Sequence, residues 1–193
     1  MLKELVRKCR SYRRFDEGHE IDTAVLKELV ELARLAPSTG NMQPLKYMIS
    51  SEPASNELIF PHLLWAGYLK DWPGPAKGER PSAYIVILRD NSIFKAQTCD
   101  HGVAAQTMFL GAAEFGYGGC IISNMDRDSL VRDLGVPEHM EVLLVLALGK
   151  PVEEIRLIPV GPDGDMKYWR DEQGVHHVPK RNLEEIIIGI ADY

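Results

Sequence analysis

Apolar residues recur at helical spacing in the stretch that follows Ile21 and Asp22. The stripe consists of Val25, Leu29, Leu32, Ala33 and Ala36. Asp22 belongs to the residue types that cap helix N-termini, and Ile21 is placed to pack onto Leu26. Pro37 favours an end to the helix, because a residue before proline is pushed out of helical geometry. We therefore predict an amphipathic helix from about residue 22 to residue 36.

The remaining patterns predict further helices and strands. Continuous apolar runs predict buried strands at 84–88 and 142–148, and a shorter one at 47–50. Helical patterns cover 54–69, about 98–115, and 126–134 with Asp126 as cap and Gly135 as stop. Helices and strands are interleaved without many tight βα units. The fold class predicted is α+β, a mostly antiparallel sheet covered by helices, in a single domain over residues 1–193.

Two segments carry no clear periodicity. Residues 71–81 hold three prolines and two glycines, which predicts an ordered loop, and 72–80 is the candidate lid. Gly161-Pro162-Asp163-Gly164 predicts a turn. Residues 166–177 then alternate aromatic and charged side chains, and the sequence assigns them no role.

Composition and charge exclude several classes of function. The 193 residues carry a formal net charge of −6, which argues against binding to nucleic acid phosphates. No apolar run reaches the length of a membrane span, and the first residues resemble no secretion signal. The three cysteines are far apart and match neither a disulfide framework nor a metal site. We expect a cytoplasmic protein without a structural metal.

Basic residues gather near both ends of this acidic chain. Arg10, Arg13 and Arg14 lie within five residues, and Lys180 and Arg181 lie near the other end. Guanidinium groups suit phosphate and carboxylate, since they present several donors in a planar fork. We expect the two clusters to converge on one anionic ligand.

Other chemistry-bearing residues have simpler interpretations. The glycines at 116–119 follow a helix and precede a strand, the reverse of the Rossmann order. Cys120 fits a small buried residue better than a nucleophile, and Asp100 fits a helix cap better than a catalytic acid. His176 and His177 are adjacent, so they point in opposite directions on an extended segment. A set of anion donors without a nucleophile or metal is typical of a protein whose chemistry belongs to a bound cofactor.

Several motifs carry a resemblance to a known family. Arg10-Ser11-x-Arg13-x-Phe15 resembles the N-terminal motif of the nitroreductase family of FMN-dependent oxidoreductases, and residues 33–44 (Ala-Arg-x-Ala-Pro-Ser-x-Gly-Asn-x-Gln-Pro) resemble its second motif. Three weaker motifs follow in the family's order: Gly116-x-Gly118-Gly119-Cys120, Ala147-Leu148-Gly149-x-Pro151 and Pro179-Lys180-Arg181-x-Leu183.

The resemblance implies a sandwich fold, an obligate homodimer and two FMN sites at the subunit interface. It implies that Arg10, Ser11 and Arg13 hold the phosphate, ribityl chain and pyrimidine edge, and that Lys180 and Arg181 complete the phosphate clamp. From the other subunit it implies contacts by Pro37, Ser38, Thr39 and Asn41. It places Gly118, Gly119 and Cys120 along the flavin ring.

The resemblance also implies the reaction. NAD(P)H would give hydride to flavin N5, and a small organic acceptor such as a nitroaromatic or a quinone would then take the electrons, in a ping-pong mechanism. No side chain is expected to be catalytic, although Arg13 is placed to tune the flavin. Cys9 and Leu45 depart from residues common in the family, and so does the aromatic segment 166–170.

Two alternatives remain open from the sequence. One is a dehalogenase-like or flavin-fragmenting enzyme on the same fold, in which a lid closes over the flavin. The other is a flavin-binding protein without turnover. The preference between NADH and NADPH is not encoded in any motif.

Overall fold

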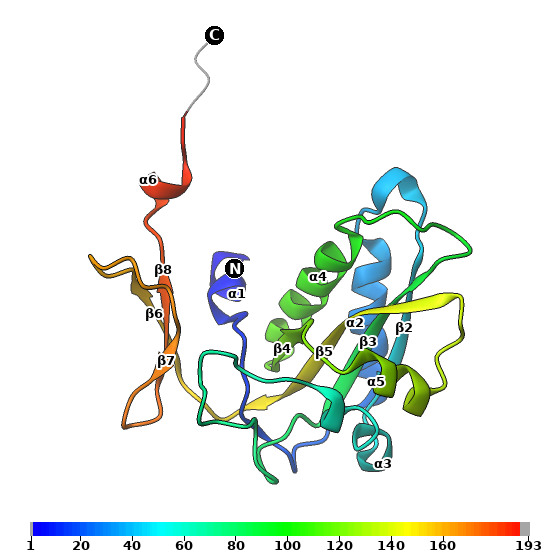
Figure 1. The fold of residues 1–193 in the computed structure, drawn as a ribbon, viewed down its shortest axis with the longest axis horizontal. Helices are drawn as coiled ribbons and strands as arrows, with labels where there is room; N and C mark the ends of the chain where they lie inside the picture. The colour runs from blue at the N-terminus through cyan, green and yellow to red at the C-terminus, as the bar shows by residue number, and fades with distance from the viewer. Residues whose placement is uncertain (1, 190–193) are drawn as a thin grey trace. The chain divides into compact units, whose positions relative to one another are not determined.

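The structure is a computed structural model that describes residues 2–189. The chain divides into two compact units (Figure 1). Of the described residues, the first unit contains 2–65 and 73–152, and the second contains 66–72 and 153–189. The prediction of a single domain over residues 1–193 stays a prediction.

The first unit is built on a five-stranded sheet in the order β1-β5-β3-β2, with β4 also paired to β5. Its strands are β1 (Phe15–Asp16), β2 (Leu45–Ser50), β3 (Ala83–Asp90), β4 (Gly118–Ile122) and β5 (Met140–Pro151). All four strand pairs are antiparallel. This confirms the predicted antiparallel sheet, and the three apolar runs form β2, β3 and β5.

Helices surround this sheet. They are α1 (Leu2–Lys8), α2 (Thr23–Leu35), α3 (Pro53–Asn56), α4 (Asp100–Glu114) and α5 (Arg127–Leu134), with 3₁₀ turns η1 (Thr39–Asn41) and η2 (Phe60–His62). The predicted caps are confirmed: the Asp22 carboxylate accepts from the Ala24 N–H at 2.8 Å, and Asp126 accepts from the Ser129 N–H at 3.2 Å. Gly135 ends α5 in the left-handed conformation, with φ 62°.

The two faces of the sheet bury two separate cores. Along β3, Ile85 and Ile87 face the core that α2 and α4 cover, whereas Tyr84 and Val86 face the core beneath α5 and η2. The alternation follows from the two-residue period of a strand. On β5 the alternation is interrupted at Leu143 and Leu144, which both belong to the core that α2 and α4 cover. There the register with β3 shifts, because Ile87 pairs with Leu144 and Leu88 pairs with Val142. Figure 1 shows α2 and α4 side by side.

Glycine in α4 lets the two helices of the first core approach closely. A Cβ on Gly111 would lie 2.5 Å from Leu32 Cδ1 and 3.0 Å from Leu29 Cδ2. The small residues of α4 at this level therefore serve packing within one chain. Near the start of α4 the space is open, because a Cβ on Gly102 would meet no atom within 4 Å.

The predicted helix over 54–69 is wrong. Only α3 and η2 form there, and Leu63 instead pairs with Met125 in an isolated β-bridge. Pro61 lies inside the stretch and cannot continue a helix, because it has no N–H and its ring clashes with the preceding turn. Residues 66–72 belong to the second unit rather than to this core.

The second unit holds a three-stranded sheet in the order β6-β8-β7. Its strands are β6 (Ile155–Pro159), β7 (Trp169–Arg170) and β8 (His176–Lys180), and α6 (Leu183–Ile186) follows. The predicted turn is confirmed, since the Gly164 N–H donates to the Gly161 carbonyl at 2.9 Å. His176 is buried and His177 is partly exposed, as expected for adjacent residues on a strand. No helix among residues 2–189 has the length and apolar character to cross a membrane.

Close packing around Gly119 gives a test of this fold. A Cβ on Gly119 would collide with the Ala147 carbonyl oxygen, a backbone atom of β5 that is held by the sheet. Gly119→Ala should lower the free energy of unfolding by about 1–3 kcal/mol. Gly102→Ala should raise it by about 0.5–1 kcal/mol, because alanine favours a helix and the space is open. Urea unfolding measures both, and equal effects would contradict the packing described.

Candidate functional site

The arginine-rich segment before β1 lies against the first residues of β4. Ser11 forms a parallel bridge with Gly119, and the Tyr12 N–H donates to the Gly119 carbonyl at 2.8 Å. A Cβ on Gly118 would meet the Tyr12 ring and Pro151. Glycine at 118 and 119 is therefore required by the approach of neighbouring protein segments. The structure brings the segment that holds Arg10 and Ser11 next to Gly118 and Gly119, and their role in one ligand site stays a prediction.

Two guanidinium groups belong to this cluster. Arg10 donates through Nη2 to the Val6 carbonyl at 2.6 Å, while its Nε is buried and has no hydrogen-bond partner among residues 2–189. Arg13 is only 9% exposed and donates to the Ser11 carbonyl at 3.1 Å. Ser11, which lies between them in the sequence, is exposed. A buried guanidinium N–H without a partner costs free energy, so an anionic ligand here would be favoured.

Cys9 adjoins this cluster from the end of α1. Burial raises the pKa of the Cys9 thiol, against the hydrogen bond from Gln106 and the charge of Arg10. The thiol is therefore held in its neutral form at pH 7, and it packs against α4 rather than acting as a nucleophile.

Two residues predicted near the cluster have other roles in the structure. Arg14 forms an ion pair with Glu79, with Nε donating to Oε2 at 2.8 Å, so its charge is already compensated. The expectation that Arg14 adds to the charge available for an anion is thus corrected. The Cys120 side chain is buried in the core beneath α5. The contact with the flavin ring that the resemblance implies for Cys120 would therefore be made by its backbone.

A second cluster surrounds Asp100, the first residue of α4. The Ser38 hydroxyl donates to Asp100 Oδ2 at 2.6 Å, and the Thr39 hydroxyl and N–H donate to Oδ1 at 2.7 and 3.1 Å. Burial of the carboxyl raises its pKa, but these hydrogen bonds outweigh burial and lower the pKa to about 2. Asp100 thus fixes the loop after α2. The predicted role as the cap of α4 is wrong, because Cys99 is the N-cap residue and the Asp100 carboxylate is taken up by Ser38 and Thr39.

The backbone of this loop is unusual. Gly40, Asn41 and Gln43 have φ values of 56°, 55° and 50°, in the left-handed region that Asn tolerates better than most residues. The Asn41 side-chain oxygen accepts from Gln43 Nε2 at 3.2 Å. Asn41 therefore shapes the loop, while Pro37, Thr39 and Asn41 remain exposed at its surface and Ser38 is partly exposed.

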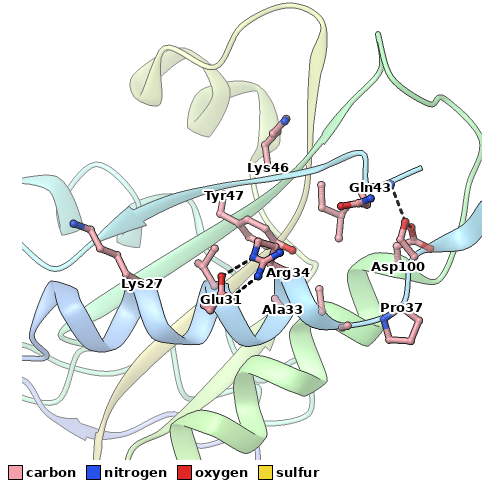
Figure 2. A pocket seen from close by; sticks show the side chains of 14 residues that line it. Lys27, Glu31, Ala33, Arg34, Pro37, Gln43, Lys46, Tyr47 and Asp100 are labelled. Atoms are coloured by element: carbon pink, nitrogen blue, oxygen red, sulfur yellow. Dashed lines mark hydrogen bonds and ion pairs between the residues drawn. The ribbon is translucent and has the colours of Figure 1, made fainter. Parts of the chain in front are cut away.

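A cavity of about 380 Å³ lies beside the loop (Figure 2). Its lining comes from α2, from the loop that includes Pro37 and Ser38, from β2 and from the first turns of α4. Arg34 and Glu31 in its wall form an ion pair with both guanidinium–carboxylate distances at 2.6 Å. Burial, followed by the charge of Asp100, raises the pKa of Tyr47 to about 12. Sequence reasoning missed this cavity, because α2, β2 and α4 must first assemble to form it.

The two clusters meet α4 at different levels. Gln106 Nε2 donates to the Cys9 Sγ at 3.6 Å. The start of the arginine segment therefore contacts α4 six residues after Asp100, which contacts the loop 37–41. Six residues span about 9 Å along a helix axis. The helix α4 therefore separates the loop 37–41 from the segment 10–13 within one chain.

The second basic cluster lies in the second unit. Lys180 ends β8, and its carbonyl accepts from the Val160 N–H at 3.0 Å. Arg181 Nη1 lies 3.4 Å from Glu185 Oε2, in an exposed pair one helical turn apart. The predicted convergence of Lys180 and Arg181 with Arg10 and Arg13 stays a prediction, because the two clusters belong to different units.

The Asp100 cluster yields a pH-dependent stability prediction. Asp100→Asn should lower the free energy of unfolding by about 1–3 kcal/mol at pH 7, since the Ser38 and Thr39 donors lose a charged acceptor. The pKa in the folded protein lies below the unfolded value of about 3.9, so this stabilisation is full above that pH. It is lost as the pH falls toward about 2. Urea unfolding at pH 7 and pH 3 measures it, with exposed Glu138→Gln as control; a difference independent of pH would contradict the assignment.

Comparisons with known proteins agree with these motifs. A model of the nitroreductase family matches residues 6–150. A Bacillus subtilis (strain 168) protein, provisionally named NAD(P)H nitroreductase MhqN, is 24% identical over an alignment that covers 79% of this chain and 89% of that protein.

Solved structures share the fold. A nitroreductase family protein from Clostridium difficile 630 superposes with a TM-score of 0.67 at 19% identity and covers 95% of both chains. An FMN-dependent nitroreductase from Clostridium difficile R20291 gives a TM-score of 0.62 at 20% identity, over 78% of this chain and 87% of that one. With the family model spanning most of the first unit, the chain belongs to the nitroreductase family of oxidoreductases.

Proposed function

We propose that this protein is an FMN-dependent oxidoreductase that takes hydride from NAD(P)H and passes electrons to a small organic acceptor by a ping-pong mechanism. The acceptor class is a nitroaromatic or a quinone. In the balanced reaction NAD(P)H and one proton reduce a quinone to its hydroquinone and leave NAD(P)⁺. The names of the relatives, an NAD(P)H nitroreductase and an FMN-dependent nitroreductase, support the two cofactors.

The observation that carries the proposal is the buried Nε of Arg10. It is a cationic donor without a partner among residues 2–189, and Ser11 and the buried Arg13 belong to the same short segment. FMN phosphate carries up to two negative charges at neutral pH, while this chain has a net charge of −6. Such a ligand needs local positive charge, and this donor set fits it. Arg10 and Ser11 would hold the phosphate and the ribityl chain.

Arg13 would contact the pyrimidine edge of the flavin. Bound FMN supplies hydride acceptance at N5 and electron transfer to the acceptor. A guanidinium about 4 Å from a developing negative charge stabilises that charge by about 4 kcal/mol at an effective dielectric constant near 20. Since Arg13 is buried, its position is held by the protein. Its guanidinium stays charged, so it would stabilise the reduced flavin by its charge and would not transfer a proton.

We also propose that the functional form is a homodimer. Within one chain, α4 holds the loop 37–41 at a different level from the segment 10–13, so one chain presents the two donor sets separately. In the dimer, Pro37, Ser38, Thr39 and Asn41 of one chain would complete the flavin site of the other. Large apolar side chains stay exposed at 183–188, where Ile188 is fully exposed. An exposed apolar segment of this kind is typical of an association surface.

The cofactor and the hydride donor are tested by visible spectroscopy. The purified protein, as isolated or after reconstitution with FMN, should show the yellow absorbance of bound flavin. Anaerobic NADH or NADPH should bleach this absorbance, and an added quinone should restore it. A colourless protein that FMN cannot reconstitute would overturn the proposal. Flavin that binds but is not bleached by either nucleotide would instead favour the flavin-binding alternative.

The arginine cluster is tested by FMN titration. Arg10→Ala and Arg13→Ala should each raise the Kd for FMN about 10- to 100-fold, because a hydrogen bond to a charged group contributes about 1.5–3 kcal/mol. Arg132→Ala, which removes an exposed guanidinium on α5, is the control and should leave the Kd unchanged. FMN occupancy in Arg10→Ala and Arg13→Ala equal to that of the control would remove these residues from the site.

A further inference from the structure

The first unit contains another cavity, at the end of its sheet where β2 ends and β3 begins. It has a volume of about 270 Å³, below the range of about 300–1,000 Å³ typical of pockets for drug-sized ligands. The residues proposed to bind FMN are not among those that line it. We call it the β3-entry cavity and define it by six of its lining residues: Glu17, Glu20, Glu57, Phe60, Arg80 and Ser82.

Ser82, the residue before β3, keeps a buried hydroxyl without a hydrogen-bond partner. Only 6% of Ser82 is exposed, and its Oγ forms no hydrogen bond within residues 2–189. The nearby Asn56 amide is already engaged, since its Nδ2 donates to the Ser82 carbonyl at 2.9 Å and its Oδ1 accepts from Ser50 Oγ at 2.7 Å. A buried hydroxyl without a partner costs free energy. Because Ser82 lines the cavity, rotation about its one side-chain bond presents the hydroxyl to a ligand there.

Arg80 supplies a second unsatisfied donor from the same segment. Its Nη1 donates to Glu57 Oε1 at 2.9 Å, and its guanidinium carbon lies 4.2 Å from the centre of the Phe60 ring, where a cation is attracted to the ring face. These two contacts hold the guanidinium in place, yet its Nε is buried and has no hydrogen-bond partner within residues 2–189. Arg80 and Ser82 therefore offer two donors, which together suit the two oxygens of a carboxylate.

The remaining charge around the β3-entry cavity is negative. Its lining includes three carboxylates, those of Glu17, Glu20 and Glu57. Among the described residues that line it, Arg80 is the one positive group, so the formal balance is −2. Glu17 accepts a hydrogen bond from the Gly78 N–H, whereas Glu20 is exposed and forms no ion pair within residues 2–189. A ligand that carries only negative charge would be repelled.

The carboxylates of the cavity suit an organic cation better than a metal ion. Among residues 2–189, no group of three or more His, Cys, Asp or Glu side chains could hold a metal ion. Carboxylates that are spread along a cavity can instead each bind a different ammonium group of one organic molecule. Donors for a carboxylate beside acceptors for ammonium groups are the combination that recognises a free α-amino acid. The excess of negative charge favours a second positive group on its side chain.

We propose that the β3-entry cavity binds a free basic α-amino acid, lysine or arginine. The Arg80 Nε and the Ser82 hydroxyl donate to its carboxylate, and its two positive groups lie against the carboxylates of the cavity. Such a ligand joins the turn after β1 to α3 and to the start of β3, so its binding stabilises the folded protein. The inference is independent of the proposed oxidoreductase function, because it uses none of the residues assigned to FMN.

Isothermal titration calorimetry of the purified full-length protein tests the class of ligand. L-Lysine should show saturable binding to one site, with a Kd of about 1 mM or tighter. L-Norleucine, which lacks the side-chain ammonium group, and cadaverine, which lacks the carboxylate, should each bind at least about tenfold more weakly. Absence of saturable L-lysine binding would overturn the proposal, whether or not the protein holds flavin. An affinity for norleucine or cadaverine equal to that for lysine would also overturn it.

Single substitutions test the place of binding. Ser82→Ala and Glu20→Gln should each raise the Kd for L-lysine about three- to tenfold, through loss of a donor and of a charge. Ser82→Ala should not lower the free energy of unfolding without lysine, because the hydroxyl that it removes has no partner within residues 2–189. Glu138→Gln, which removes an exposed carboxylate outside the cavity, is the control and should leave the Kd unchanged. An unchanged Kd in both Ser82→Ala and Glu20→Gln would overturn the proposal and would leave an ordered water as the partner of the Ser82 hydroxyl.

Discussion

The candidate site depends on the close approach of one extended segment to one strand. The Tyr12 N–H binds the Gly119 carbonyl, and the bridge between Ser11 and Gly119 sets the register. Any side chain on Gly118 or Gly119 would occupy space that Tyr12, Pro151 and the β5 backbone already fill. Because β4 is itself fixed by β5, Arg10 and Arg13 extend from a rigid edge of the sheet, where orientation is more precise than on a free loop.

The helix α4 organises the rest of the first unit. Gly111 admits α2 into close contact, Gln106 meets Cys9 at the end of α1, and Asp100 anchors the loop that follows α2. One helix therefore fixes both donor sets and also the spacing between them. That spacing is the structural basis for the dimer we propose, since a second copy of the chain would bring the loop of one subunit to the arginine cluster of the other.

Local signals in the sequence predicted much of this fold, and long-range contacts account for what it missed. Asp22, Asp126 and Gly135 defined helix ends correctly because capping depends on a few neighbouring residues. Pro61 was a local signal against a helix over 54–69, but the prediction relied on the helical spacing of the apolar residues instead. No local signal pairs Asp100 with Ser38, 62 residues away, or Arg14 with Glu79, 65 residues away. The candidate site residues were predicted from motifs, whereas their hydrogen bonds and the cavity beside α2 required the assembled chain.

The central claim is that the Arg10–Arg13 segment, positioned on Gly119, holds the phosphate end of FMN. The most direct measurement is a crystal structure of the protein reconstituted with FMN. Our account predicts the phosphate or ribityl oxygens within hydrogen-bond distance of Arg10 and Ser11, with Arg13 at the pyrimidine edge. Flavin bound elsewhere, for example in the cavity between α2 and β2 with Arg10 and Arg13 making no contact, would contradict it.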